Sequence, residues 1–171
     1  MFLIGVAIFK GMIRIGFSTP RRKSLISSFI CWATKSRVSH VFFVYWDKDW
    51  DADFVLDVIE TGFRIIPLAK YETINRIVEI VEPQVPIDIG VKEIALNYLG
   101  TPYSFKGLLG VGIVQLGRWL KRKWSNPLHT SETLFCSQCA VLALQSSGYP
   151  KSSGLVPEDC TPQDVLDFLK D

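Results

Sequence analysis

Four apolar segments with the character of β-strands follow one another between residues 38 and 82, and this run most constrains the fold. They are rich in β-branched and aromatic residues and span 38–46, 53–60, 63–67 and 76–82. A charged turn, Asp47 to Asp51, separates the first two, and Gly62 ends the second. Short connections of this kind bring consecutive strands together in antiparallel order, so the pattern predicts a central antiparallel sheet.

Segments with helix signals flank these strands. Those with a clear start or stop are 88–99 before Gly100, 136–147 before Gly148, and a short last helix opened by Thr161 and Pro162. Ahead of the strand run, 3–9 has the composition of a further strand, and Ser18-Thr19-Pro20 predicts the start of a helix over 24–34. Helices around a central run of strands indicate an α+β fold.

The bulk composition narrows the function classes. The 171 residues suffice for one core, so we expect a single domain over 1–171. The net charge is +2 and basic residues form no run longer than Lys121 to Lys123, which gives no reason to expect nucleic-acid binding. The apolar start lacks a basic region and a cleavage site, and no apolar run is long enough to span a membrane. The sequence therefore predicts neither a signal peptide nor a transmembrane helix, and it leaves the localisation open.

Two registers are open to the hairpin formed by the first two strands of the run. In one register Phe42 faces Asp57, which puts a carboxylate in an apolar row. Shifted by one residue, the facing pairs on that side are apolar until the last pair, His40 and Glu60. Burial of apolar side chains favours the second register. It predicts a carboxylate beside His40, which would fix the tautomer of the ring and favour its charged form.

Cys136 has the features of a nucleophile. It opens the apolar run of the helix predicted over 136–147, and a thiol in the first turn of a helix has a lowered pKa. A nearby imidazolium would lower that pKa further. Cys139 lies one turn deeper and is expected in the core. One Cys-x-x-Cys pair with no second pair does not make a structural zinc site, so we expect no metal and no other cofactor.

Two motifs resemble those of a known superfamily. Residues 95–103 (Ala-Leu-Asn-Tyr-Leu-Gly-Thr-Pro-Tyr) resemble the helix-end signature of NlpC-type peptidases, which precedes a Cys-Ser motif at the head of a buried helix. That motif corresponds here to Phe135-Cys136-Ser137-Gln138. The histidine segment Ser39-His40-Val41 comes before the cysteine, an order that resembles the circularly permuted branch, which includes the YiiX-like hydrolases and the lecithin retinol acyltransferase group.

The resemblance implies a permuted papain-like fold and a cysteine hydrolase. Cys136 would be the nucleophile, His40 its base and Glu60 the residue that orients the base. Tyr103 and the start of the cysteine helix at Ser137 would bind the oxyanion or the substrate. No cofactor is implied.

The resemblance leaves more than one function open. The first expectation is an endopeptidase or amidase that cleaves a peptide of cell-wall peptidoglycan. The alternative is a lipid amidase or acyltransferase of the lecithin retinol acyltransferase type. A third alternative, from a different class, is a structural or binding module that keeps the fold without catalysis.

An apolar insertion at about 105–124 bears on this choice. It carries aliphatic and aromatic residues beside the basic run Lys121 to Lys123. Such a segment is typical of a peripheral membrane contact or of a cover for an acyl chain. A core helix with a solvated basic end fits the pattern equally well. In either case its position between Tyr103 and Cys136 predicts that it lies beside the site.

Overall fold

The computed structural model describes residues 12–22, 31, 36–59, 61–98, 100–101, 103–128, 130 and 133–171. In this part of the chain five strands form one antiparallel sheet in the order β4-β3-β2-β1-β5. The strands are β1 (Arg14–Pro20), β2 (His40–Asp47), β3 (Ala52–Ile59), β4 (Gly62–Pro67) and β5 (Asn75–Val81). The predicted α+β class and the central antiparallel sheet are confirmed.

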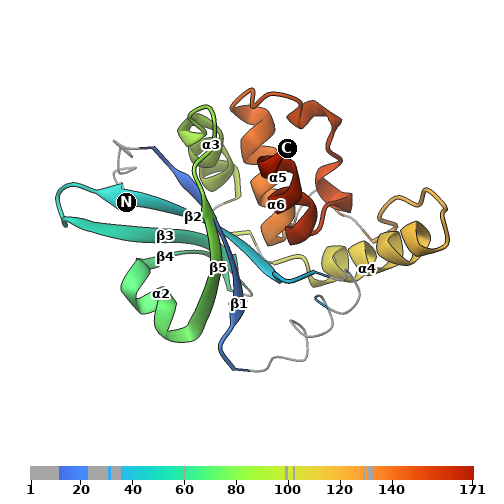
Figure 1. Cartoon of the computed structure of the whole chain (residues 1–171), viewed down its shortest axis with the longest axis horizontal. Helices are drawn as coiled ribbons and strands as arrows, with labels where there is room; N and C mark the ends of the chain where they lie inside the picture. The colour runs from blue at the N-terminus through green and yellow to red at the C-terminus, as the bar shows by residue number, and fades with distance from the viewer. Residues whose placement is uncertain are drawn as a thin grey trace.

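Helices cover both faces of the sheet (Figure 1). One face is covered by α2 (Leu68–Ile74), which packs against β3, β4 and β5. On the opposite side lie α3 (Asp88–Tyr98), α5 (Cys136–Ser146) and α6 (Pro162–Lys170), together with the 3-10 turns η1 (Ser152–Gly154) and η2 (Pro157–Asp159). The remaining described helix, α4 (Phe105–Trp119), extends sideways from this layer.

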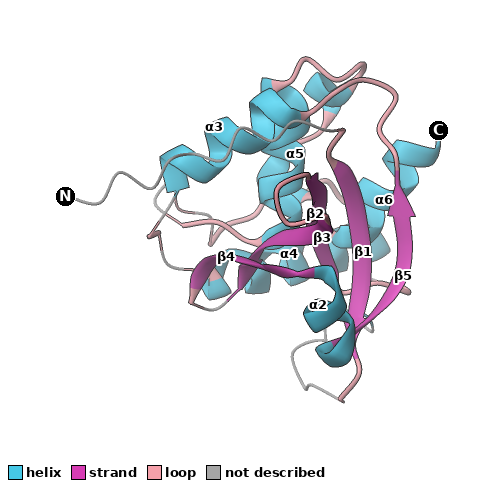
Figure 2. Ribbon diagram, turned by 90° about the vertical axis from the view of Figure 1, so that its left-hand side faces the viewer, coloured by secondary structure: helices cyan, strands magenta, loops and turns pink. Residues whose placement is uncertain are grey.

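Side chains of β2 alternate between the two layers, as the pleat of a strand requires. Val41 and Phe43 belong to the larger core, which includes residues of α3, α5 and α6. Phe42 and Val44 belong to a smaller core completed by Tyr71 of α2. His40 is two residues before Phe42, so its side chain points to the same face, and its ring stacks on that of Phe42. This is the face that α2 covers, and the turned ribbon view shows α2 beside the strands (Figure 2).

The sequence located most elements but not β1. The four predicted strands and the three helices with start or stop signals are confirmed to within about two residues at each described end. The helix start predicted at Ser18-Thr19-Pro20 is wrong, because these residues end β1 and are paired with both β2 and β5. The strand predicted at 3–9 lies outside the described residues, as does the helix predicted over 24–34 apart from Cys31.

The favoured hairpin register is also wrong. The strands β2 and β3 pair Trp46 with Asp53 and Phe43 with Leu56, and the same register continued places Phe42 opposite Asp57. A carboxylate in an apolar row is costly when it has no partner. That cost is offset because the carboxylate is paired with charged groups on two strands, as the site geometry below describes.

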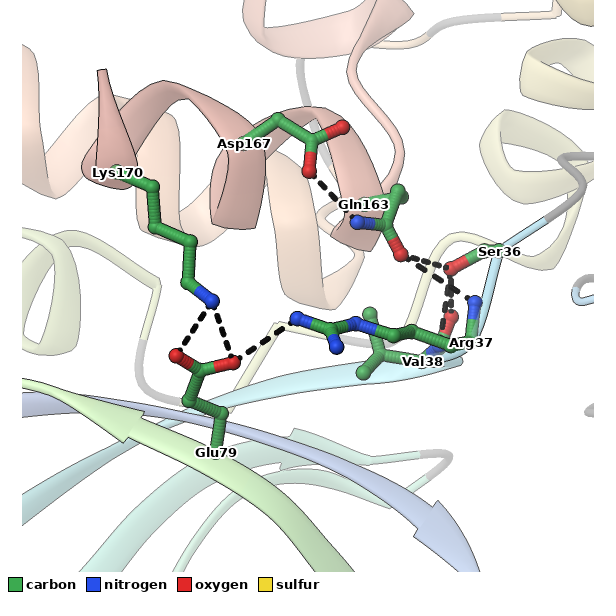
Figure 3. A network of polar contacts seen from close by, with 7 residues as sticks. All are labelled: Ser36, Arg37, Val38, Glu79, Gln163, Asp167 and Lys170. Atoms are coloured by element: carbon green, nitrogen blue, oxygen red, sulfur yellow. Dashed lines mark hydrogen bonds and ion pairs between the residues drawn. The ribbon is translucent and has the colours of Figure 1, made fainter.

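A polar network joins α6 to the sheet just ahead of His40 (Figure 3). Glu79 of β5 accepts hydrogen bonds from Lys170 of α6, at 2.8 Å, and from Arg37, at 3.0 Å. The backbone N–H of Arg37 also donates to the side chain of Gln163 in α6, at 3.3 Å. The segment that enters β2 is therefore held by both the helical layer and the sheet.

A tight contact at Gly16 of β1 provides a test of this packing. A Cβ atom at this position would lie 2.2 Å from the ring of the fully buried Phe42, whereas a Cβ at Gly154 would meet nothing within 4 Å. We expect Gly16→Ala to lower the free energy of unfolding by about 1–3 kcal/mol through overpacking. Gly154→Ala, the control, should leave it nearly unchanged in denaturant titrations. Equal stability of the two variants would contradict the described contact between β1 and β2.

Candidate active site

The side chains of Cys136 and His40 meet where α5 approaches the start of β2. The helix α5 begins at Cys136, because Phe135 is extended and its carbonyl accepts the first helical hydrogen bond, from Cys139 N–H at 2.9 Å. The packing of α5 against β2 and β3 brings this end of the helix to His40, the first residue of β2. A hydrogen bond joins the imidazole to the thiol.

The sulfur of Cys136 lies in a polar environment although the residue is only 3% exposed. Besides His40, two backbone N–H groups donate to it, from Val41 of β2 and from Ser137 of α5. Hydrogen bonds of this kind stabilise a thiolate more than a thiol. The environment therefore favours a negative charge on the sulfur.

A carboxylate lies on the other side of the imidazole. His40 Nε2 is 3.3 Å from Asp57 Oδ2. This is the diagonal contact that the observed register allows, because Asp57 is opposite Phe42 and His40 is two residues before Phe42 on the same face. The side chain of Asp57 is 1% exposed and that of His40 is 19% exposed. The three side chains form the chain Cys136–His40–Asp57.

Arg64 completes the pairing of this buried carboxylate. It faces Asp57 across the β3–β4 pair and donates twice to it, from Nε at 3.0 Å and from Nη2 at 2.7 Å. A bidentate pair of hydrogen bonds fixes both the position and the orientation of a carboxylate. Asp57 is thus held from β4 while it contacts His40 on β2.

The pKa values of these groups shift in the directions that favour a negative charge on the thiol and a positive charge on the imidazole. Burial alone would raise the pKa of Cys136, but the charge of His40 and its hydrogen bond lower it below the ordinary thiol value. Burial alone would lower the pKa of His40, but the charge of Cys136 and the hydrogen bond to Asp57 raise it. Burial would likewise raise the pKa of Asp57, and the hydrogen bonds from His40 and Arg64 lower it. The arrangement favours thiolate and imidazolium together.

Aromatic side chains cover the imidazole of His40 on the side that faces α2. Phe42 stacks on His40 with ring centres 6.5 Å apart, and Tyr71 packs on Phe42 at 4.5 Å. The hydroxyl of Tyr71 is hydrogen-bonded to Ser18 Oγ at 2.7 Å. Burial raises the pKa of Tyr71, so its phenol stays neutral beside the charged pair.

The other predicted site residues have different outcomes. Glu60 lies outside the described residues, and the carboxylate that contacts His40 is Asp57. The hydroxyl of Ser137 donates to the backbone carbonyl of Cys160 at 2.8 Å, so only the N–H of Ser137 faces the sulfur. Tyr103 pairs through its backbone with Leu134, two residues before Cys136, and its ring packs on that of Phe105 at 5.1 Å.

Sequence reasoning missed Asp57 and Arg64 as members of the site. The signal was present, since Asp57 is the one charge among the five apolar residues of 54–59. A charge inside a buried strand requires a partner. The residue that faces it across the turn at Gly62 is Arg64, which supplies that partner.

The described residues contain no group of three or more His, Cys, Asp or Glu side chains arranged to hold a metal ion. A scan against protein-family models gives no match, and a search of curated proteins gives no significant match. A function for the chain therefore has to rest on the geometry of Cys136, His40 and Asp57.

The charge state of the pair predicts selective alkylation. We expect iodoacetamide at near-neutral pH to modify Cys136 faster than Cys31, Cys139 or Cys160, because burial raises the pKa of each of the other three thiols, to about 12 for Cys160. The rate at Cys136 should reach half its maximum at a pH below the usual thiol value of about 8.5. Peptide mapping by mass spectrometry over a pH series measures both quantities.

His40→Ala is the matched variant for this measurement. Burial of Cys136 disfavours the thiolate, and the imidazolium of His40 offsets that effect. Without the imidazolium the pKa of Cys136 therefore rises, and the midpoint of labelling moves to higher pH. Cys31 is the more exposed thiol, so it serves as an internal reference for access to the reagent. An unchanged midpoint in His40→Ala would show that the two side chains are not coupled.

Proposed function

We propose that this protein is a cysteine hydrolase of the permuted papain-like type, acting on an acyl compound through Cys136, His40 and Asp57. The observation that supports the proposal is the chain of these three side chains, in which a buried thiol at a helix start is hydrogen-bonded to an imidazole that a carboxylate pairs. A nucleophile, a base and a residue that orients the base are the minimum set for covalent acyl transfer.

The reaction proceeds in two steps. In the first, the thiolate of Cys136 attacks the carbonyl carbon, and the imidazolium of His40 gives its proton to the departing amine or alcohol, which leaves a thioester. In the second, neutral His40 takes a proton from water, the resulting hydroxide equivalent attacks the thioester, and the acid is released with the thiolate restored. Because Nε2 of His40 is directed at Asp57, we assign the exchanged proton to Nδ1.

Backbone and paired groups support both steps. Once the sulfur has bonded to the carbonyl carbon and lost its charge, the N–H of Ser137 that donated to the thiolate can donate to the oxyanion on the carbonyl oxygen. Asp57 keeps the imidazole in one orientation and stabilises its charged form. Arg64 keeps Asp57 ionised and in place, which makes it a positioning residue rather than a catalytic one.

Our first candidate substrate is an amide bond in a peptide of cell-wall peptidoglycan. It is supported by the resemblance of residues 95–103 and of the motif at Cys136 to NlpC-type peptidases. The proposed chemistry requires neither a metal nor an organic cofactor.

The second candidate substrate is a lipid amide or ester, and a specific observation favours it. The helix α4 begins next to the site, because Ser104 N–H donates to Leu134 O at 2.8 Å. Five of its exposed side chains, from Phe105 to Trp119, are large and apolar. An apolar surface of this extent beside a nucleophile suits an acyl chain better than a polar peptide.

Trapping the acyl-enzyme tests the proposal. We expect an acyl donor of the correct class to leave a hydroxylamine-sensitive mass adduct on Cys136, visible by intact mass and peptide mapping. Purified peptidoglycan fragments and lipid vesicles, assayed in parallel for released products, distinguish the two substrate classes. Cys136→Ala should lose both adduct and turnover while it keeps its melting temperature. Turnover that persists in Cys136→Ala would refute the mechanism, and neither adduct nor turnover with any donor would favour the non-catalytic binding module.

A comparison of two carboxylates tests the role of Asp57. Asp57→Asn should reduce turnover by roughly 10²–10⁴-fold and move the alkylation midpoint of Cys136 to higher pH, because His40 loses its charged partner. Glu60 is the carboxylate that the sequence predicts beside His40, and Glu60→Gln should change neither turnover nor the alkylation midpoint strongly. Melting temperatures of both variants separate loss of folding from loss of function. The opposite ranking would return the orienting role to Glu60.

A further inference from the structure

The outward side of α4 is an unbroken apolar stripe. It consists of six large hydrophobic side chains, each 38–56% exposed, and the first five recur every three or four residues, the spacing of one helix face. They are Phe105, Leu109, Ile113, Leu116 and Trp119 within α4 and Leu120 at its C-cap. Other exposed hydrophobic residues of the described chain, such as Ile89 and Leu96, are distributed over other elements. We call the six residues the α4 stripe.

Contacts on the inner side of α4 keep this stripe turned outward. Gly110 packs so closely on Asn126 that a Cβ would lie 1.7 Å from its side-chain oxygen. Asn126 Nδ2 donates to the carbonyls of Gly107 and Glu158, both at 2.8 Å. Near the other end, Arg118 Nη1 donates to Asp164 Oδ2 of α6 at 2.8 Å. The helix is therefore fixed at both ends, and its apolar side cannot turn inward without loss of these contacts.

Positive charge gathers beside the stripe. Residues 103–130 contain Lys106, Arg118 and the run Lys121 to Lys123 but no acidic residue. The whole chain has a net charge of only +2, so the rest of the molecule is net negative. The three residues of the basic run are exposed and directly follow Leu120 at the end of the stripe.

We propose that the α4 stripe docks in the interface of an anionic lipid bilayer. An apolar helix face with an interfacial tryptophan and adjacent lysine and arginine residues is the pattern of a helix that lies on a membrane. No described helix is long and apolar enough to cross a membrane, which is consistent with surface attachment. A second copy of the chain is a poorer occupant, because pairing two stripes would bring the like-charged flanks together.

Docking through α4 would bring the reactive thiol close to the lipid. Ser104, the N-cap of α4, is bonded to Leu134, and Phe135 packs at Gly107, so the membrane-facing helix starts beside the residues that lead into Cys136. Lipid carbonyls lie at the depth of the headgroup boundary, where such a helix rests. The docking itself does not rest on the proposed chemistry.

Vesicle sedimentation tests the docking. We expect the full chain to sediment with phosphatidylcholine vesicles that contain phosphatidylglycerol, and much less with phosphatidylcholine alone. Leu109→Ser, Ile113→Ser and Leu116→Ser combined should abolish sedimentation and leave the melting temperature nearly unchanged, because all three side chains are exposed. The control replaces Ile89, Leu96 and Val156 by Ser, three exposed residues outside α4, and should sediment as the parent does.

Two further variants distinguish the possible binding partners of the α4 stripe. Replacing Lys121, Arg122 and Lys123 by Gln should weaken binding to the anionic vesicles by on the order of a hundredfold and reduce its salt dependence. Cys136→Ala should bind as the parent does, so a failure of docking and a failure of the proposed hydrolase are distinguishable. The proposal is overturned if the parent does not sediment with anionic vesicles. It is also overturned if the α4 variant sediments normally, or if the parent is a dimer in solution that this variant converts to a monomer.

Discussion

The pairing of Asp57 is the constraint on which the sheet and the candidate site both depend. Its carboxylate is 1% exposed, and a buried charge is tolerated only with partners of opposite charge in good geometry. Arg64 from β4 and His40 from β2 supply these partners. A slip of one residue between β2 and β3 would turn Asp57 to the other face of the sheet, away from His40. The strand register and the arrangement of the site therefore follow from the same pairing.

This pairing acts on Cys136 from the opposite layer of the molecule. His40 belongs to the sheet, whereas Cys136 belongs to α5. Their contact requires that the spacing between the sheet and the helical layer is maintained. The network that joins Glu79 to Arg37 and Lys170 contributes at this point, because it holds the entry to β2 against α6. Groups that are far from the thiol thus help to determine its charge state.

The sequence was informative where local chemistry determines the structure. Gly62, Gly100 and Gly148 all have positive φ angles, and each was identified as the end of an element from its residue type alone. The last helix has the predicted cap at Thr161, completed by Asp164 in a capping box. Turns and caps depend on a few neighbouring residues, so one sequence is sufficient to locate them.

The errors concern features that depend on distant residues. Nothing near Gly16 in the sequence indicates its role in β1, which is to provide the space that Phe42 needs in the neighbouring strand. Asp57 was interpreted as an unfavourable polar intrusion, because its partners lie on two other strands and become visible only when both registers are known. The short helix α2, which contributes Tyr71 to the wall of the site, was not predicted, since its seven residues carry no cap signal.

The same separation between local and distant constraints applies to the substrate. Thiolate, imidazolium and carboxylate accept any suitably placed carbonyl, and neither the fold nor the three side chains determine which acyl compound reaches them. Under the proposed hydrolase function, a peptide would approach from water, whereas a lipid carbonyl would be delivered by the surface to which the protein binds. The choice would then be made outside Cys136, His40 and Asp57, by the surface that surrounds them. Since the α4 stripe begins beside the residues that lead into Cys136 and is followed by the basic run, α4 is the element that, under this proposal, would select an acyl chain over a peptide.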